Sequence, residues 1–189
     1  MQGWRDISAT VGWLYFLAWS LSFYPQVWLN YSLKSVAGFS LEYALLNPSG
    51  YFFYSCYNVG GSVDPYLGTG IVEIQDLIFA VHGLALSNVC FVQSLIYESG
   101  TQKETNRFVV AFLVFLWLCV ITTYLFEVFD HPIYDLNWDT FLVMGYAKAA
   151  ITFVKYVPQV FLNYRRKSTE GLSMLNIMLD LAGGLLSFL

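Results

Sequence analysis

The sequence is poor in charge and in cysteine for its length. Of 189 residues only 12% are charged, about half of the roughly 25% that is typical of a soluble domain. The net charge of −4 provides no basic surface for nucleic acid. Cys56, Cys90 and Cys119 lie singly within apolar segments, so neither a disulfide framework nor a zinc site is indicated.

Apolar side chains take the place of the missing charge. They make up 57% of the sequence, aromatic residues reach 19%, and the mean hydropathy is +0.55. A soluble globule of this length could not bury so much apolar surface in one core, whereas lipid can cover it. Six apolar segments have the length of about 20 residues that a membrane-spanning helix needs; they are 9–31, 40–60, 74–97, 107–129, 138–164 and 172–189. We therefore expect one all-α transmembrane domain over residues 1–189.

The basic residues are segregated to one side of these segments. Arg5 alone falls on the other side. Because cytosolic loops carry an excess of Lys and Arg, we expect the N-terminus to face the lumen or the exterior. The basic residues that fall in or beside the three cytosolic loops are Lys34, Lys103, Arg107, Arg165, Arg166 and Lys167.

Two stretches of the sequence repeat each other without gaps, at an offset of 133 residues (159 minus 26). Residues 25–50 and 158–183 share Pro-Gln, Asn, Lys-Ser, Gly and Ser at equal spacing, and Asn47 corresponds to Asp180. Both copies run in the same direction across the membrane, so each repeat needs an odd number of helices.

The repeat defines three parts of the domain. We expect a first three-helix repeat at 9–97, an inverting linker helix at 107–129 and a second repeat at 138–189. This scheme predicts seven helices, of which the sequence contains six, and the second repeat is expected to be incomplete.

Charged residues inside the apolar segments are expected to face a cavity, because lipid-facing Asp or Lys is costly. Asp180 and Lys148 both fall near the membrane midplane, where secondary transporters bind their substrates. Asp180 is the candidate proton carrier and Lys148 a candidate ligand for a substrate carboxylate; a permanent ion pair between them is the structural alternative. We expect Lys155 to extend towards the cytosolic surface.

Polar and proline residues supply further candidates. Asn47 and Asn176 have the donors and acceptors that an amino acid requires, or they join helices by hydrogen bonds. Asn163 near the cytosolic end is either a substrate ligand or a capping residue. Proline breaks the helical hydrogen-bond ladder, so the two Pro-Gln pairs, Pro25-Gln26 and Pro158-Gln159, are hinges for alternating access or static kinks.

The phrases Tyr24-Pro25-Gln26 and Val157-Pro158-Gln159, each followed by Asn, Lys-Ser and Gly, resemble the motif of the PQ-loop transporter family. The stretches Lys155–Gln159, Lys167–Gly171 and Leu179–Gly184 are similar to the lysosomal, proton-coupled cystine exporters of that family. The resemblance implies a PQ-loop/SWEET-like fold and proton symport of cystine out of a lysosome or vacuole. It also implies a proton site at Asp180, a role for Asp76 in proton entry, substrate contacts at Asn163, and hinges at the PQ motifs.

Alternative functions remain open at this point. The same machinery could carry another amino acid, such as a cationic one, or the chain could be a non-transporting trafficking or scaffold protein. We expect no enzymatic activity, since the sequence has no nucleophile–base constellation, metal-ligand cluster or phosphate-binding loop. We expect no cofactor or metal, with protons as the coupling ion, and as partners the bilayer and an amino acid; protein partners stay open.

Overall fold

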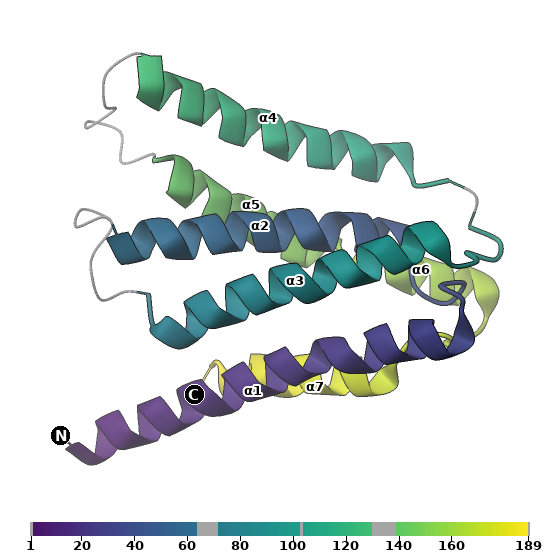
Figure 1. The fold of residues 1–189 in the computed structure, drawn as a ribbon, viewed down its shortest axis with the longest axis horizontal. Coiled ribbons are helices and arrows are strands. Elements are labelled where there is room, and N and C mark those ends of the chain that lie inside the picture. The colour runs from purple at the N-terminus through teal and green to yellow at the C-terminus, as the bar shows by residue number, and fades with distance from the viewer. Residues whose placement is uncertain (1, 64–71, 103, 130–138, 189) are drawn as a thin grey trace.

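The computed structural model describes residues 2–63, 72–102, 104–129 and 139–188, and these residues are almost entirely helical (Figure 1). Lys103 and the Arg5 side chain, used in the orientation argument, lie outside the described part. The helices are α1 (Gln2–Leu33), α2 (Leu41–Val63), α3 (Ile74–Ile96), α4 (Arg107–Phe129), α5 (Thr140–Val154), α6 (Tyr156–Arg166) and α7 (Met174–Leu186).

The six apolar segments each form a helix, and the fifth is broken into α5 and α6 at Lys155. Pro158 explains the break, because it lacks the N–H that the carbonyl of Val154, four residues earlier, would accept. The second PQ motif thus coincides with a helix break, and its role as a hinge stays a prediction. Pro25 lies inside α1 without interrupting it, so the two PQ motifs differ in their local structure.

The outward surface of the bundle is apolar. Within the described parts of the chain, three helical stretches are long and apolar enough to cross a membrane: α3, α4 and Thr140–Arg166; α7 is a shorter apolar helix. Large apolar side chains such as Phe108, Phe153 and Phe129 are exposed, as expected of a surface covered by lipid. The chain is therefore an all-α membrane protein.

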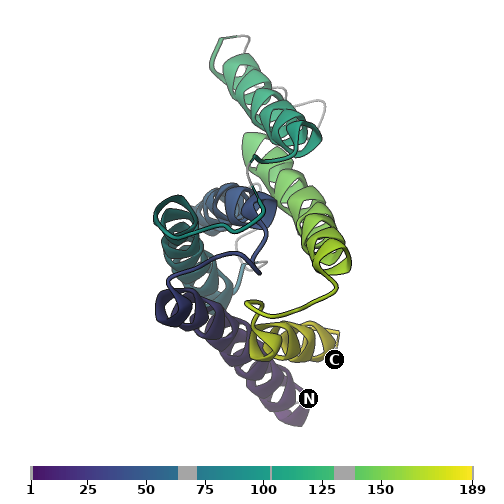
Figure 2. The same ribbon diagram turned by 90° about the vertical axis from the view of Figure 1, so that its right-hand side faces the viewer.

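Helix packing follows the sequence repeat (Figures 1 and 2). In the first repeat α3 packs against both α1 and α2. Between the repeats α1 packs on α7, and α5 packs on α2. Since α1 corresponds to α5–α6 and α2 to α7, these two contacts are equivalent, and the repeats face each other with approximate two-fold symmetry.

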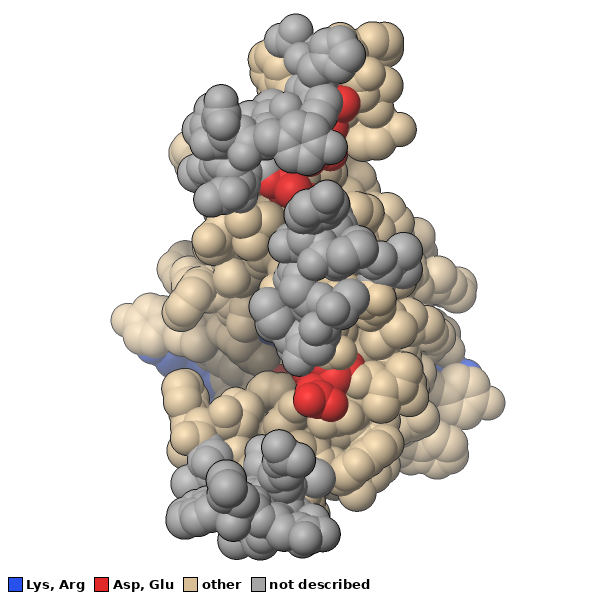
Figure 3. Space-filling view, turned by 90° about the vertical axis from the view of Figure 1, so that its left-hand side faces the viewer, with Lys and Arg blue, Asp and Glu red and all other residues tan. Residues whose placement is uncertain are grey.

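The two ends of the bundle differ in charge. At one end, here called the basic end, Lys34 follows α1, Arg107 begins α4, and Arg165 and Arg166 end α6. The opposite, acidic end shows Asp and Glu side chains, with Lys and Arg visible only at the far edges (Figure 3). The charge separation expected from the sequence is thus present in the described residues.

Candidate functional site

A cavity of about 350 Å³ lies where the two repeats meet. Helices α1, α2, α3, α5, α6 and α7 contribute to its walls, and its polar groups come from α5–α6 and α7 on one side and from α2 on the other. The residues that line it are Trp19, Tyr51, Tyr54, Phe79, Lys148, Thr152, Lys155, Tyr156 and Asp180.

Asp180 is held between hydroxyl groups from both repeats. The Tyr156 hydroxyl donates to Oδ2 at 2.8 Å, and the Ser22 hydroxyl lies 2.6 Å from Oδ1. Ser22 Oγ also lies 2.7 Å from the backbone carbonyl of Trp19, whose indole N–H donates to the backbone oxygen of Asp180 at 3.1 Å. The carboxylate is therefore fixed against α1 and keeps one edge on the cavity.

The two lysines of the cavity are surrounded by tyrosine rings. Lys148 Nζ donates to Thr152 Oγ1 at 3.1 Å and lies 4.2 Å from the Tyr51 ring centroid. Lys155 Nζ donates to Asn47 Oδ1 at 3.2 Å and lies about 5 Å from the ring of Tyr156. Tyrosine faces attract cations, so these contacts position both ammonium groups, and no described carboxylate is hydrogen-bonded to either.

The polar contacts on the two sides of the cavity occupy equivalent positions of the repeats. Ser22 corresponds to Lys155, and Asn47 corresponds to Asp180, each pair 133 residues apart. Accordingly, Ser22 bonds Asp180 and Lys155 bonds Asn47 across the same type of helix contact. The backbone frame is symmetric, whereas its chemistry is a carboxylate on one side and an ammonium on the other.

The glutamine of the first PQ motif clamps the loop of the second repeat. Gln26 Oε1 accepts from the N–H of Ser173 at 2.8 Å, and Gln26 Nε2 donates to the carbonyl of Gly171 at 3.1 Å and to Asn30 Oδ1 at 2.8 Å. Gln26 is buried, so all these groups depend on one another for hydrogen bonds.

The glutamine of the second PQ motif makes the equivalent clamp on the first repeat. Gln159 Oε1 accepts from the N–H of Ser40 at 2.8 Å, and Nε2 donates to the carbonyl of Gly38 at 2.9 Å and to Asn163 Oδ1 at 3.0 Å. The two clamped loops cross at Gly38 and Gly171, where a Cβ on Gly38 would lie 2.1 Å from the Glu170 carbonyl oxygen. This crossing closes the basic end beneath the cavity.

The structure brings together only some of the predicted site residues. Asp180 and Lys148 line the cavity. Asn47 is buried and does not line the cavity itself, but it accepts a hydrogen bond from Lys155, which does. Asn176 joins α7 to α1 by donating to the Ser22 carbonyl at 2.6 Å. Asn163 belongs to the basic-end closure.

Asp76 lies in the first turn of α3, towards the acidic end. It accepts from the Tyr15 hydroxyl at 3.4 Å and is not among the residues that line the cavity. Its role in proton entry stays a prediction.

Two expectations about the lysines are corrected. Lys155 does not extend to the surface: it is only 4% exposed, because the helix break turns its side chain inward to Asn47 and the tyrosines. The permanent ion pair between Lys148 and Asp180 is not formed in the described residues, where their polar contacts go to Thr152 and to hydroxyl groups instead.

Most of the aromatic wall was missed by sequence reasoning. Trp19, Tyr51, Phe79 and Tyr156 look like ordinary lipid-facing or core aromatics in a sequence in which 19% of residues are aromatic. Only Tyr156 had a signal in the sequence, because it belongs to the stretch Lys155–Gln159 that carries the resemblance to the PQ-loop family.

These observations define a helical membrane protein with a polar cavity between two repeats. The family model for the PQ loop repeat matches residues 7–67 and 141–189. The chain is 39% identical to a cystinosin homolog from Dictyostelium discoideum over 97% of this chain and 66% of the relative. It is 38% identical to cystinosin from Bos taurus (97% and 52%) and 25% identical to a cystine transporter from Saccharomyces cerevisiae (95% and 75%).

The chain belongs to the PQ-loop family and is a cystinosin-like member of it. The two matched regions coincide with the first part of each sequence repeat. The chain spans between about half and two thirds of the length of the Dictyostelium and Bos taurus relatives.

Proposed function

We propose that this chain is a transporter that moves cystine together with protons from an acidic lumen to the cytosol by alternating access. The observation that carries the proposal is the cavity between the repeats, which exposes one carboxylate and two ammonium groups to a single space. The names of the relatives support cystine as the substrate. The basic loops support a multi-pass orientation with a luminal N-terminus, and a lysosomal or vacuolar membrane rests on the resemblance.

The charges of the cavity match those of cystine, which carries two α-carboxylates and two α-ammonium groups. Lys148 and Lys155 are suited to bind carboxylates, since their Nζ atoms have donors to spare beyond Thr152 and Asn47. Asp180 is suited to bind an ammonium group. In this scheme Asn47 and Asn176 position Lys155 and α7, and contact substrate only through these neighbours.

The contacts of Asp180 support a role in carrying the proton. Ser22 has one hydroxyl hydrogen, yet its oxygen lies within 2.7 Å of both the Trp19 carbonyl and Asp180. When Asp180 is ionised, Ser22 donates to it; when Asp180 is protonated, the acid donates to Ser22, which donates to the carbonyl. The site thus accommodates both protonation states by turning one hydroxyl. Asp76 is proposed to assist proton entry from the acidic end.

The closure at the basic end and the helix break support alternating access. The hydrogen bonds between the two repeats that involve Gln26, Gln159, Asp180, Lys155 and Asn176 lie at the level of Asp180 or nearer to the basic end. This is the arrangement of a state open towards the lumen. Opening to the cytosol would release the Gln26 and Gln159 clamps, with Pro25 and Pro158 as hinges; bending at the α5–α6 break would move Lys155 and Tyr156 directly.

Uptake into liposomes tests this function. The purified chain is reconstituted with a neutral interior, and radiolabelled cystine is added in an acidic or a neutral bath. We expect uptake above that of protein-free liposomes, stimulated by the acidic bath and competed by unlabelled cystine. Competition by lysine instead would favour a cationic substrate, and the absence of any uptake would contradict transport and favour a scaffold.

A further inference from the structure

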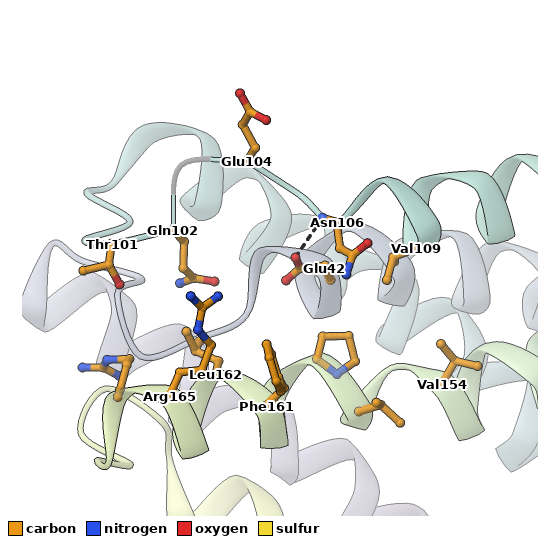
Figure 4. Close-up of a pocket in the computed structure, with 13 residues that line it drawn as sticks. Glu42, Thr101, Gln102, Glu104, Asn106, Val109, Val154, Phe161, Leu162 and Arg165 are labelled. Atoms are coloured by element: carbon orange, nitrogen blue, oxygen red, sulfur yellow. Dashed lines mark hydrogen bonds between the residues drawn. The ribbon is translucent and has the colours of Figure 1, made fainter.

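A second and larger cavity lies at the basic end, outside the contact between the repeats. Its volume is about 820 Å³, and none of the residues that line the first cavity takes part in it. It is bounded by α6, the start of α4, the start of α2 and the segment that connects α3 to α4 (Figure 4). Cavities of this size hold ligands as large as a drug molecule.

One wall of this cavity is apolar and belongs to the membrane-spanning helices. Val157, Phe161 and Leu162 line the cavity from α6. Val109 of α4 lies across from Phe161 (Figure 4). The opposite wall is polar and comes from the connecting segment, with Thr101, Gln102, Glu104 and Asn106. The cavity therefore has the two-part character of a membrane–water interface, apolar on the bilayer side and polar beyond it.

Two arginines line the cavity, and Arg166 already donates to the Glu170 carbonyl at 2.8 Å. Arg165 points towards Gln102 (Figure 4); its guanidinium lies 5.5 Å from the Phe161 ring centroid and has no hydrogen bond or ion pair with any described residue.

Neither acidic residue of the lining is hydrogen-bonded to Arg165 among the described residues. The Glu42 carboxylate already accepts from the N–H of Asn106 at 3.0 Å and from the Ser40 hydroxyl at 2.8 Å. Glu104 points away from the cavity (Figure 4). Arg165 therefore has guanidinium donors free for an anion in the cavity.

We propose that this cavity binds an anionic glycerophospholipid of the leaflet at the basic end. Its phosphate would accept from Arg165, and an acyl chain would lie along Val157, Phe161 and Val109. Three features favour a lipid: the apolar wall belongs to α4 and α6, α4 is exposed along its length, and basic pockets between membrane helices bind anionic head groups. The lipid would also contact Pro158, beside the break between α5 and α6.

Native mass spectrometry in detergent with added phosphatidylglycerol tests the head-group contact. We expect a one-lipid adduct on the wild type, and an affinity lower by about tenfold in Arg165→Glu and Arg165→Gln, because the charge-assisted hydrogen bonds to phosphate are lost. The matched control is Arg107→Glu, which reverses a charge at the same end but outside the cavity lining. A wild type without adduct, or an equal loss in Arg107→Glu, would overturn the proposal.

A steric pair of variants tests the acyl-chain contact. Val157→Trp fills the apolar wall and is expected to remove the adduct, whereas Val160→Trp adds the same bulk to an exposed position of α6 that does not line the cavity and is expected to retain it. Excess inorganic phosphate should leave the adduct in place. Displacement by phosphate, or an unchanged adduct in Val157→Trp, would show a site for a free anion or a site elsewhere and would contradict lipid binding.

Discussion

The two repeats build the same closure but different walls for the cavity between them. At the basic end Gln26 and Gln159 make matching sets of hydrogen bonds, each to a glycine carbonyl, a serine N–H and an asparagine four residues later in the same helix. At the level of the cavity, Asp180 stands where the first repeat has Asn47, and Lys155 stands where it has Ser22.

The positions that match between the repeats hold the structure together, whereas the positions that differ supply the charged groups of the cavity. The closure at the basic end is released when both clamped loops come free. Matching hydrogen bonds from Gln26 and Gln159 hold the two loops equally. A site for a zwitterion and a proton instead needs one carboxylate opposite ammonium groups, because two like groups would repel each other or one kind of substrate charge would lack a partner. Substitution at two equivalent positions within a symmetric backbone is enough to provide this asymmetry.

The closure should break most severely where the two loops cross. Gly38→Val would place side-chain atoms against the backbone of Glu170 and Gly171, and we expect a loss of about 3 kcal/mol or a failure to form the closed state. Thermal unfolding in detergent measures it. Gly184→Ala is the control, since nothing lies within 4 Å of its Cβ position; equal thermal stability of the two variants would contradict the crossing.

The stability of the cavity wall around Lys155 should depend strongly on Asn47. Asn47→Leu leaves the buried ammonium of Lys155 without its acceptor, and we expect destabilisation of about 2 kcal/mol. The double variant with Lys155→Met should regain much of this loss, because the need for an acceptor is then gone. Asn88→Ala, at an exposed site, should have little effect. Thermal unfolding of the wild type, Asn47→Leu, Lys155→Met and the double variant would show whether the two residues are coupled.

The symmetry of the closure predicts equal effects for the two glutamines. Gln26→Ala and Gln159→Ala each remove a buried side chain that bonds one serine N–H and one glycine carbonyl of the other repeat, and each should cost about 1–2 kcal/mol. Both variants should also open the basic end more often, which labelling of a cysteine introduced at Ser40 or Ser173 would report. A large effect in one variant and none in the other would show that the clamps are not equivalent.

The smallest effects are expected for the hydroxyl groups around Asp180. Ser22→Ala and Tyr156→Phe each remove one hydrogen-bond partner of the carboxylate, at a cost of about 1 kcal/mol. Ser22→Ala should reduce the stimulation of cystine uptake by an acidic bath more than Tyr156→Phe does, because only Ser22 connects Asp180 to a backbone acceptor. The ratio of cystine uptake in acidic and neutral baths measures this stimulation. Equal ratios in the two variants would contradict the proposal that the Ser22 hydroxyl rotates between Asp180 and the Trp19 carbonyl.

The sequence was sufficient for the helices and for the charged centre of the site. Hydrophobic segments predicted every helix to within a few residues except for the start of α1 and the break at Lys155, and the intramembrane position of Asp180 and Lys148 predicted that they line a cavity. These features follow from local composition, since a charge within an apolar segment must turn inward.

The clamps and the aromatic wall could not be predicted in the same way. The sequence marked Gln26 and Gln159 as hinge residues beside proline, but their partners are loop atoms 119 to 147 residues away. Such contacts depend on how the repeats pack, which no local pattern specifies. Lys155 was misassigned for the same reason: its distance from the cytosolic end favours snorkelling, whereas the helix break turns it towards Asn47.

Proton-coupled cystine uptake by Asp180→Asn tests the central claim most directly. Wild type and a matched Glu98→Gln control, which changes an exposed acid outside the cavity, should both take up radiolabelled cystine faster from an acidic bath than from a neutral one. Asp180→Asn should show no such stimulation while it still exchanges cystine across the membrane without a pH gradient. If acid stimulation persists undiminished in Asp180→Asn, the proton is carried elsewhere and the account of this cavity is wrong.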